Sequence, residues 1–347
     1  VLLPNPFAAT ECTHAVDSVI MAVSSAPDLE CAAALQRLEA HIVSASNSDP
    51  QVLARLPLIV GSLCVRLRDC ITPVVAEEDT AQKSRLCRQV VNSLVSIANS
   101  RVCVNALSCT ALRDVLRETL AALVSDRIAS AEESEHLSRA LNVLLVRTLE
   151  NGDATAVFSA LIGLLEETLR VAPPAGTPAS SPLVQLPEFV MKCLWKMTKQ
   201  IGALLAAPGE KLSSPRSSLA LRPHATLDAV QVLSDIETFF RALPPMEWKL
   251  RASHQCPLGD LPLRTIKTIL HELCTAMRAS LVPAVLSLPG ASEGFVLPYV
   301  RTMLGAMGVD VAVLYPSAPV SKEISQETAK SQELSAAEID ARLAEIC

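Results

Sequence analysis

Residues 139–169 read RALNVLLVRTLENGDATAVFSALIGLLEETL, two apolar segments joined by Asn151-Gly152. In both segments apolar residues recur at steps of three and four, which is the period of an α-helix. In the first segment they cover more than half of the helical circumference, so this helix needs neighbours on two sides. The stretch therefore predicts two adjacent helices joined by a short turn, the unit from which stacked helical repeats are built.

The same period recurs along the rest of the chain. It is found in LQRLEAHIVSA from residue 35, LRDVLRETLAALVSD from 112, LDAVQVLSDIETFFRAL from 227 and LRTIKTILHELC from 263. No alternating pattern typical of strands persists anywhere. We therefore predict an all-α protein with about a dozen helices, stacked as a solenoid of about six helix pairs because each pair is too small to bury its apolar face alone. A compact helical bundle is the alternative.

Three polar stretches interrupt this pattern. Residues 172–183 and 207–224 are rich in Pro, Ser and Gly, and we expect them to be exposed, flexible insertions in a domain that spans 1–316. Residues 317–333 are expected to form a polar linker. The chain begins VLLPNPFAAT, without an initiator Met or a signal-peptide pattern, so we expect it to be a segment of a longer protein.

Residues 334–347 predict a short amphipathic helix. Ser335 and Glu338 have the spacing of a capping box, which marks a helix start. Beyond it one apolar stripe is formed by Ile339, Leu343 and Ile346. So short a helix is marginal alone in water, and its stripe must be covered either by a groove of the body or by an external coiled coil.

The charge and hydropathy patterns exclude two classes of partner. The net charge is −6, and residues 321–347 carry half of it, so the body is close to neutral and does not resemble a nucleic-acid binder. Charged, Pro or Ser residues interrupt the apolar runs before the roughly 20 residues that a membrane span needs. Eleven cysteines, odd in number and never spaced C-x-x-C, indicate reduced thiols in a cytosolic protein.

Motifs for catalysis, cofactors and metals are absent from the sequence. Neither nucleotide-binding glycine loop nor the G-x-S-x-G elbow is found. In HELCT, residues 271–275, Thr275 stands where a zinc protease needs its second histidine. The spacing of His254, Cys256 and His271 fits no zinc pattern. We therefore predict a protein that is not an enzyme and binds neither cofactor nor metal.

The candidate binding residues lie on two predicted helices. In FVMKCLWKMTKQIGALL, residues 189–205, Trp195 stands among Lys192, Lys196 and Lys199. Trp195 lies at the border between the apolar and basic arcs, so it either packs on a neighbouring helix or anchors a partner. The helix 262–277 repeats a basic stripe with Arg264, Lys267 and His271. Two basic stripes with an aromatic residue beside one of them indicate a surface for an acidic protein partner. The alternative is an ordinary amphipathic helix whose Trp packs on the next helix while the lysines stay solvated.

Ser214 is a candidate phosphorylation site. It precedes Pro215-Arg216 in the second predicted insertion, which is the context that a proline-directed kinase requires. A phosphate there would add about −1.5 to −2 charges next to the body. An unmodified solvent-exposed loop is the alternative.

Three segments resemble a known family in their order and approximate spacing. They are RALNVLLVRTLENGDATAVFSALIGLLEETL, FVMKCLWKMTKQIG and PLRTIKTILHELC, of which MKCLWKM at 191–197 and RTIKTILH at 264–271 are the most specific. They resemble the region after the fifth TOG domain in the ch-TOG and minispindles family of microtubule polymerases. The closing RLAEIC at 342–347 is similar to the start of that family's C-terminal segment.

The resemblance implies a HEAT-repeat, TOG-like interaction domain in a protein of microtubule plus ends, spindle poles and centrosomes. Tubulin-binding TOG domains present a Trp in their first intra-repeat loop, whereas here no Trp precedes Trp195. The expected partners are therefore TACC-type coiled coils and γ-tubulin rather than strongly bound αβ-tubulin. The alternative is a helical adaptor unrelated to microtubules, in trafficking or in small-GTPase regulation.

Overall fold

The computed structural model describes residues 6–46, 48–72, 80–125, 128, 134–170, 173–206 and 227–309. All regular secondary structure in these ranges is helical, which confirms the all-α prediction. The chain divides into two compact units, the first formed mainly by residues 1–164 and the second mainly by residues 165–347. The division falls inside helix α9 (Ala154–Leu169), where the helical pattern of the sequence continues without a break.

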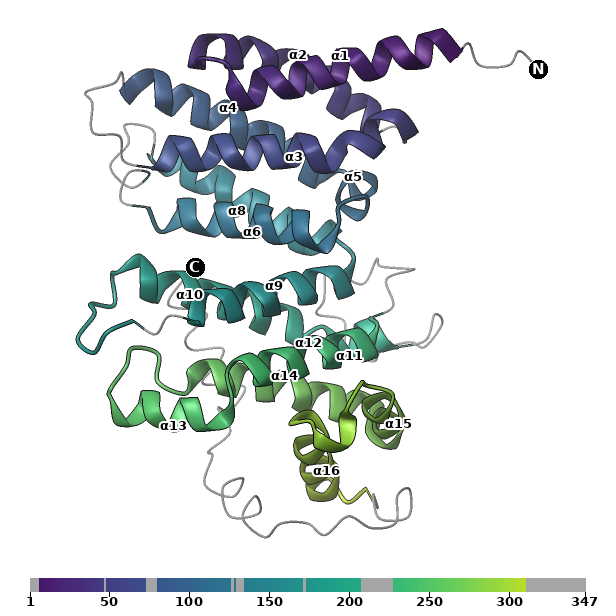
Figure 1. Ribbon diagram of the computed structural model, residues 1–347, viewed down its shortest axis with the longest axis vertical. Helices are drawn as coiled ribbons and strands as arrows, with labels where there is room; N and C mark the ends of the chain where they lie inside the picture. The colour runs from purple at the N-terminus through teal and green to yellow at the C-terminus, as the bar shows by residue number, and fades with distance from the viewer. Residues whose placement is uncertain are drawn as a thin grey trace. The chain divides into compact units, whose positions relative to one another are not determined.

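The first unit is a stack of helix pairs in two layers. Its helices are α1 (Pro6–Ser25), α2 (Asp28–Ser46), α3 (Pro50–Ile71), α4 (Thr80–Asn99), α5 (Arg101–Asn105), α6 (Cys109–Leu123), α8 (Ser134–Asn151) and the start of α9. Helices α1, α3 and α6 follow one another in one layer, and α2, α4 and α8 in the other (Figure 1). The pairs α1–α2, α3–α4 and α6–α8 are each in contact, and within these three pairs equivalent helices of successive pairs contact each other. The predicted stacking of helix pairs is therefore confirmed in this unit.

Polar side chains hold the ends of these helices. Asp49 accepts a hydrogen bond from the Gln51 amide at 3.0 Å and so caps α3. The buried Arg66 of α3 donates from Nε to the carbonyl of Val23 at 2.5 Å and from Nη2 to the carbonyl of Ala26. Val23 lies in the last turn of α1 and Ala26 directly follows the helix, where carbonyls have no partner within the helix. Arg66 therefore ties two successive helices of one layer together.

In the described residues, the second unit contains the rest of α9 and nine further elements. They are α10 (Pro182–Thr198), α11 (Ile201–Leu205), α12 (Ala229–Ala242), α13 (Pro245–Ser253), α14 (Leu261–Met277), the 3₁₀ turn η1 (Arg278–Ser280), α15 (Leu281–Leu286), the 3₁₀ turn η2 (Ala291–Glu293) and α16 (Val296–Ala306). Helix α14 is central, because it contacts α10, α11, α12 and α16 (Figure 1). The helices α10, α14 and α16 thus follow one another through direct contacts.

An aromatic cluster fills part of the core of the second unit. Trp248 of α13 stacks on Phe239 of α12, with ring centroids 6.1 Å apart and planes inclined by 12°. Phe240 contacts Phe295 and Tyr299, which lie just before and within α16. Burying such large rings supplies much of the apolar area that a helical unit needs. The sequence concentrates its few aromatic residues in this unit.

The structure narrows the first predicted insertion. Residues 173–181 form defined turns, in which the amides of Thr177 and Ser181 donate to the carbonyls of Pro174 and Pro178. Helix α10 begins at Pro182, because proline suits the first position of a helix, so residues 182–183 belong to the helix. The second insertion, 207–224, the linker 317–333 and the helix 334–347 lie outside the described residues.

Two stretches, Pro50–Ile71 and Leu261–Leu286, are long and apolar enough to cross a membrane by length and composition alone. Core helices of globular domains meet the same criterion, and both stretches bury an apolar stripe against neighbouring helices. The second stretch is also broken at Arg278, which has a φ of 49° and ends α14. Both therefore behave as core helices of their units.

Candidate functional site

Helix α10 is buried over most of its circumference. Val190, Leu194 and Met197, which fall at helical spacing on one arc, face the core, and the adjacent Met191 and Cys193 are buried too. Burial raises the pKa of the Cys193 thiol to about 12, against the opposing effect of the nearby Lys196 and Lys192. A thiol with so high a pKa is a poor nucleophile. The remaining narrow strip of α10 carries the basic residues.

Trp195 belongs to the core. Its side chain is 5% exposed, and its Nε1 donates a hydrogen bond to Oγ1 of Thr265 at 3.1 Å. The Thr265 hydroxyl in turn donates to the carbonyl of Leu261 at 2.9 Å, within α14. The structure therefore corrects the choice of Trp195 as a partner-binding residue: α14 covers the indole. Sequence analysis did not single out Thr265, although a lone hydroxyl on the apolar face of a predicted helix signals a buried polar contact.

The three lysines of α10 differ in their surroundings. Lys192 is only 16% exposed, because its Nζ pairs with Glu188 at 3.1 Å and lies 4.8 Å from the centroid of the Phe189 ring. Lys196 is half-buried, and Lys199 is exposed at the C-terminal end of the helix. Lysine stems that lie along apolar surface while their ammonium groups reach water are common on such helices. Lys196 and Lys199 are therefore better placed to meet a partner than Lys192.

The second predicted basic stripe lies on α14, which contacts α10. Arg264 is exposed and pairs with Asp260 at 2.9 Å, while the Nζ of Lys267 lies 4.8 Å from the centroid of the Tyr299 ring on α16. The Nδ1 of His271 is 3.6 Å from Oε1 of Glu272, and both side chains are half-exposed. Because α10 and α14 are in direct contact, the structure brings the two stripes onto neighbouring helices.

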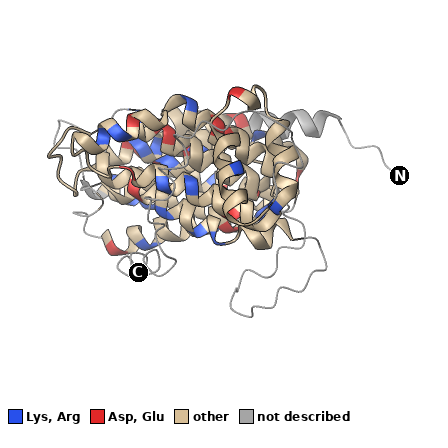
Figure 2. Ribbon diagram, turned by 90° about the horizontal axis from the view of Figure 1, so that it is seen from below, with Lys and Arg blue, Asp and Glu red and all other residues tan. Residues whose placement is uncertain are grey.

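We call these six positions the basic surface: Lys192, Lys196, Lys199, Arg264, Lys267 and His271. The positive charge of this surface is local, because Lys and Arg are interspersed with Asp and Glu over the helices drawn in Figure 2. Local charge of this kind sets which partner docks and how fast it does so, more than how tightly it is held.

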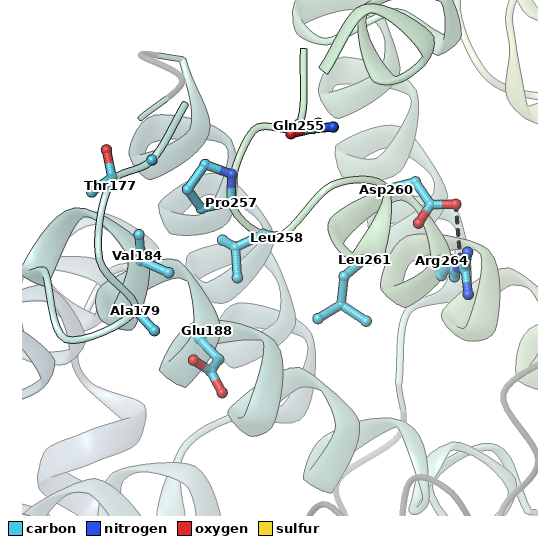
Figure 3. Close-up of a pocket in the computed structure, with 11 residues that line it drawn as sticks. Thr177, Ala179, Val184, Glu188, Gln255, Pro257, Leu258, Asp260, Leu261 and Arg264 are labelled. Carbon is cyan, nitrogen blue, oxygen red and sulfur yellow. Dashed lines mark hydrogen bonds and ion pairs between the residues drawn. The ribbon is translucent and has the colours of Figure 1, made fainter. Parts of the chain in front are cut away.

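A groove of about 740 Å³ opens at the N-terminal ends of α10 and α14 (Figure 3). One wall comes from the turns before α10 and the first turns of that helix, and the other from the loop between α13 and α14. The residues that line it are Gly176, Thr177, Ala179, Val184, Glu188, Gln255, Pro257, Leu258, Asp260, Leu261 and Arg264. Arg264 thus belongs both to the groove and to the basic surface. Sequence analysis missed the groove, because its two walls lie about 75 residues apart in the chain.

The second wall has an unusual backbone. Gln255, Leu258 and Gly259 have φ values of 51°, 69° and 49°, in the left-handed region that only glycine adopts freely. The turn is held by hydrogen bonds from the Cys256 amide to the Arg251 carbonyl at 3.0 Å and from the Gly259 amide to the Cys256 carbonyl at 3.1 Å. Figure 3 shows Pro257 and Leu258 facing Val184 across the groove. A non-glycine residue with positive φ is retained where the surrounding structure holds it.

Among the residues described, no group of three or more His, Cys, Asp or Glu side chains is arranged to hold a metal ion. The remaining candidate site residues have no described position in the structure. Ser214 and the apolar stripe of Ile339, Leu343 and Ile346 lie outside the described ranges.

No family model matches the chain, and no solved structure matches it significantly. Known proteins with related sequences do exist. The chain is 27% identical to Protein MOR1 of Arabidopsis thaliana over 255 residues, which are 72% of this chain and 12% of that protein. It is 23% identical to Protein mini spindles of Drosophila melanogaster over 278 residues, 79% of this chain and 12% of that protein. With Centrosomal protein 224 of Dictyostelium discoideum it shares 25% identity over 195 residues, 54% of this chain and 8% of that protein.

The chain therefore corresponds to about a tenth of the length of the curated relatives that it matches. Each match covers more than half of the chain, so the likeness is not confined to the three segments singled out in the sequence. The resemblance seen in those segments is confirmed, and the chain is a homologue of the proteins of the ch-TOG and minispindles family.

Proposed function

We propose that this chain is a non-catalytic protein-interaction module of a cytoplasmic protein that promotes microtubule growth at plus ends, spindle poles and centrosomes. Its relationship to MOR1 and mini spindles supports a role in the microtubule cytoskeleton. The names of two relatives, Protein mini spindles and Centrosomal protein 224, refer to spindles and to the centrosome and support the location. Stacked helix pairs suit such a module, because they present extended surfaces to partners.

The single structural observation that carries the proposal is the basic surface on α10 and α14. Its accessible members, Lys196, Lys199 and Arg264, stand on a rigid base in which Trp195 and Thr265 join the two helices. A rigid base loses little conformational entropy when a partner binds. The basic side chains match an acidic helix, and the adjoining groove can accept an apolar side chain from it.

The partner class that fits best is an acidic, amphipathic coiled coil of the TACC type. The resemblance implies γ-tubulin or αβ-tubulin as further partners, with strong αβ-tubulin binding disfavoured because Trp195 lies in the core rather than in a loop. Reversing the charge of the accessible lysines should therefore weaken binding of the coiled coil and make that binding less dependent on salt concentration.

The test is recovery of partners from a cell extract by the immobilised full chain. We expect coiled-coil centrosomal proteins and tubulins, with recovery falling as the ionic strength rises. Each recovered protein is then purified and titrated against the chain, so that direct binding is separated from co-recovery. Vesicle-coat proteins or small GTPases in place of these partners would contradict the proposal and favour the adaptor alternative.

A further inference from the structure

The groove between the N-terminal ends of α10 and α14 combines an apolar lining with neutralised charges. Val184, Leu258 and Leu261 contribute apolar surface from three different segments. The two acidic residues of the lining are each paired, Glu188 with Lys192 at 3.1 Å and Asp260 with Arg264 at 2.9 Å. An acidic ligand approaching the groove therefore meets little repulsion from these two carboxylates.

The layer that contains the groove has a positive charge, unlike the chain as a whole. Residues 182–199, 260–277 and 296–306 together hold six Lys or Arg and three Asp or Glu, a net charge of +3. Residues 321–347 hold three Lys or Arg and six Asp or Glu, a net charge of −3. The two parts of the chain are complementary in charge, whereas the whole chain has a charge of −6.

The C-terminal segment follows a helix that packs on α14. The last described residue, Val309, follows α16, which contacts α14 directly. The groove opens at the N-terminal end of α14, a helix whose 17 residues span roughly 25 Å. Ile339 is 30 residues beyond Val309. A flexible chain of that length has a root-mean-square span of roughly 30 Å, so the segment can reach the groove without being fully extended.

We propose that residues 334–347 dock in the groove of their own chain, with the stripe of Ile339, Leu343 and Ile346 against Leu258 and Leu261. The acidic residues of the segment then lie towards the basic surface. Docking covers the stripe of a helix that is too short to be stable alone. Attachment to the same chain gives a local concentration in the millimolar range, so a modest intrinsic affinity is sufficient.

Docking has a consequence for partners. A segment bound at Arg264 covers part of the basic surface, so it competes with an acidic coiled coil for the same residues. This consequence rests on the proposed function, whereas the docking itself does not.

The test is hydrogen–deuterium exchange on the full chain at low micromolar concentration, followed at residues 336–346 and at the loop 255–262. We expect the amides of 336–346 to exchange at least about tenfold more slowly than in a free peptide of the same sequence, because the bound helix must open before it exchanges. Leu343→Asp should remove this protection, and it should also speed exchange in the loop 255–262.

Leu261→Asp alters the groove side of the proposed contact. It should also remove the protection of residues 336–346 from hydrogen exchange. Leu261 is the first residue of α14, where an acidic side chain favours the helix, so the fold is preserved. The matched control is Leu29→Asp, which makes the same change in the first turn of α2 at a side chain that is 77% exposed. The control should leave exchange of 336–346 unchanged.

Each other result overturns the proposal. Peptide-like exchange of 336–346 in the unaltered chain would show that the segment is not docked. Protection that grows with protein concentration would assign the groove to a second copy of the chain. Protection that survives Leu261→Asp would place the segment elsewhere. None of these results depends on whether a microtubule-related partner binds, so failure of docking is distinct from failure of the proposed function.

Discussion

The indole Nε1 of Trp195 and the hydroxyl of Thr265 form a buried hydrogen bond of 3.1 Å that joins α10 to α14. The two residues are 70 positions apart in the chain. The bond holds together α10 and α14, the two helices that carry the basic stripes. It connects the stability of the second unit to the geometry of its candidate binding surface.

The first prediction concerns this pair. Trp195→Ala should lower the free energy of unfolding by about 3 to 5 kcal/mol, because it removes a large buried ring. Thr265→Val should lower it by about 1 to 3 kcal/mol, because the indole N–H then lacks an acceptor in the core. Urea unfolding of the two variants measures both effects. An unchanged stability for Trp195→Ala would contradict its place in the core.

A double-mutant cycle separates the hydrogen bond from packing. Trp195→Phe combined with Thr265→Val removes donor and acceptor together, so we expect the double variant to lose less stability than the sum of the single variants. Strict additivity would show that the bond contributes nothing of its own.

The second prediction concerns Gly294, which lies just before α16. The buried Glu237 carboxylate accepts hydrogen bonds from the amides of Phe295 at 3.2 Å and Val296 at 2.9 Å, and a Cβ at position 294 would come within 2.8 Å of it. Gly294→Ala should therefore lower the free energy of unfolding by about 1 to 3 kcal/mol. The matched control is Gly305→Ala, also in the α16 region, where a Cβ meets no atom within 4 Å. It should stabilise the unit by about 0.5 to 1 kcal/mol, because alanine is the better helix former. Equal effects of the two changes, measured by thermal unfolding, would refute the role of Glu237 as the cap of α16.

The third prediction concerns pH. Burial raises the pKa of the Cys193 thiol from 9.0 to about 12 in the folded chain. Between these values the unfolded chain loses the thiol proton and the folded chain keeps it. The contribution of Cys193 to the free energy of unfolding is therefore fully present below pH 9 and is lost as the pH rises towards 12. The free energy of unfolding should fall by up to about 1.4 kcal/mol per pH unit from this group. Cys193→Ala should show a shallower decline than the unaltered chain in urea titrations at pH 8, 9 and 10. Parallel declines would contradict the effect.

Much of the helical architecture could be predicted from the sequence, because it depends on local periodicity. The apolar arc of Val190, Leu194 and Met197 follows from helical spacing alone, and the structure buries all three. The same spacing left Trp195 on a border, and only contact with α14 decides that it is buried. Residues at the edge of an apolar arc depend on partners distant in the chain, which periodicity does not identify.

The groove shows a second limit of prediction from the sequence. The positive φ of Leu258 has no signature in its residue type, since leucine rarely adopts that conformation. The turn arises because Pro257 and Gly259 flank it and because α13 and α14 fix its two ends. Part of its opposite wall, with Thr177 and Ala179, comes from the segment that composition marked as a flexible insertion. A pattern confined to one segment therefore could not indicate that the two segments form one site.

The last prediction separates the lysines of the basic surface. Lys196→Glu with Lys199→Glu should weaken binding of an acidic coiled coil about tenfold or more, because close charge pairs across an interface contribute a few kcal/mol in favourable cases. The fold should be nearly unchanged, with a loss of about 0.5 kcal/mol because a negative side chain at Lys199 opposes the helix dipole.

Lys192→Glu should behave differently, since Lys192 is already paired with Glu188 and packed on Phe189. Its reversal places two like charges four residues apart and removes the cation–π contact, so it should lower the free energy of unfolding by about 1 kcal/mol. The matched control is Arg37→Glu with Arg101→Glu, which makes the same change in charge at two exposed residues of the first unit. Isothermal titration of each variant with the coiled coil, beside urea unfolding, distinguishes the two roles. Equal loss of affinity in the control would mean that net charge, rather than the surface on α10 and α14, governs binding.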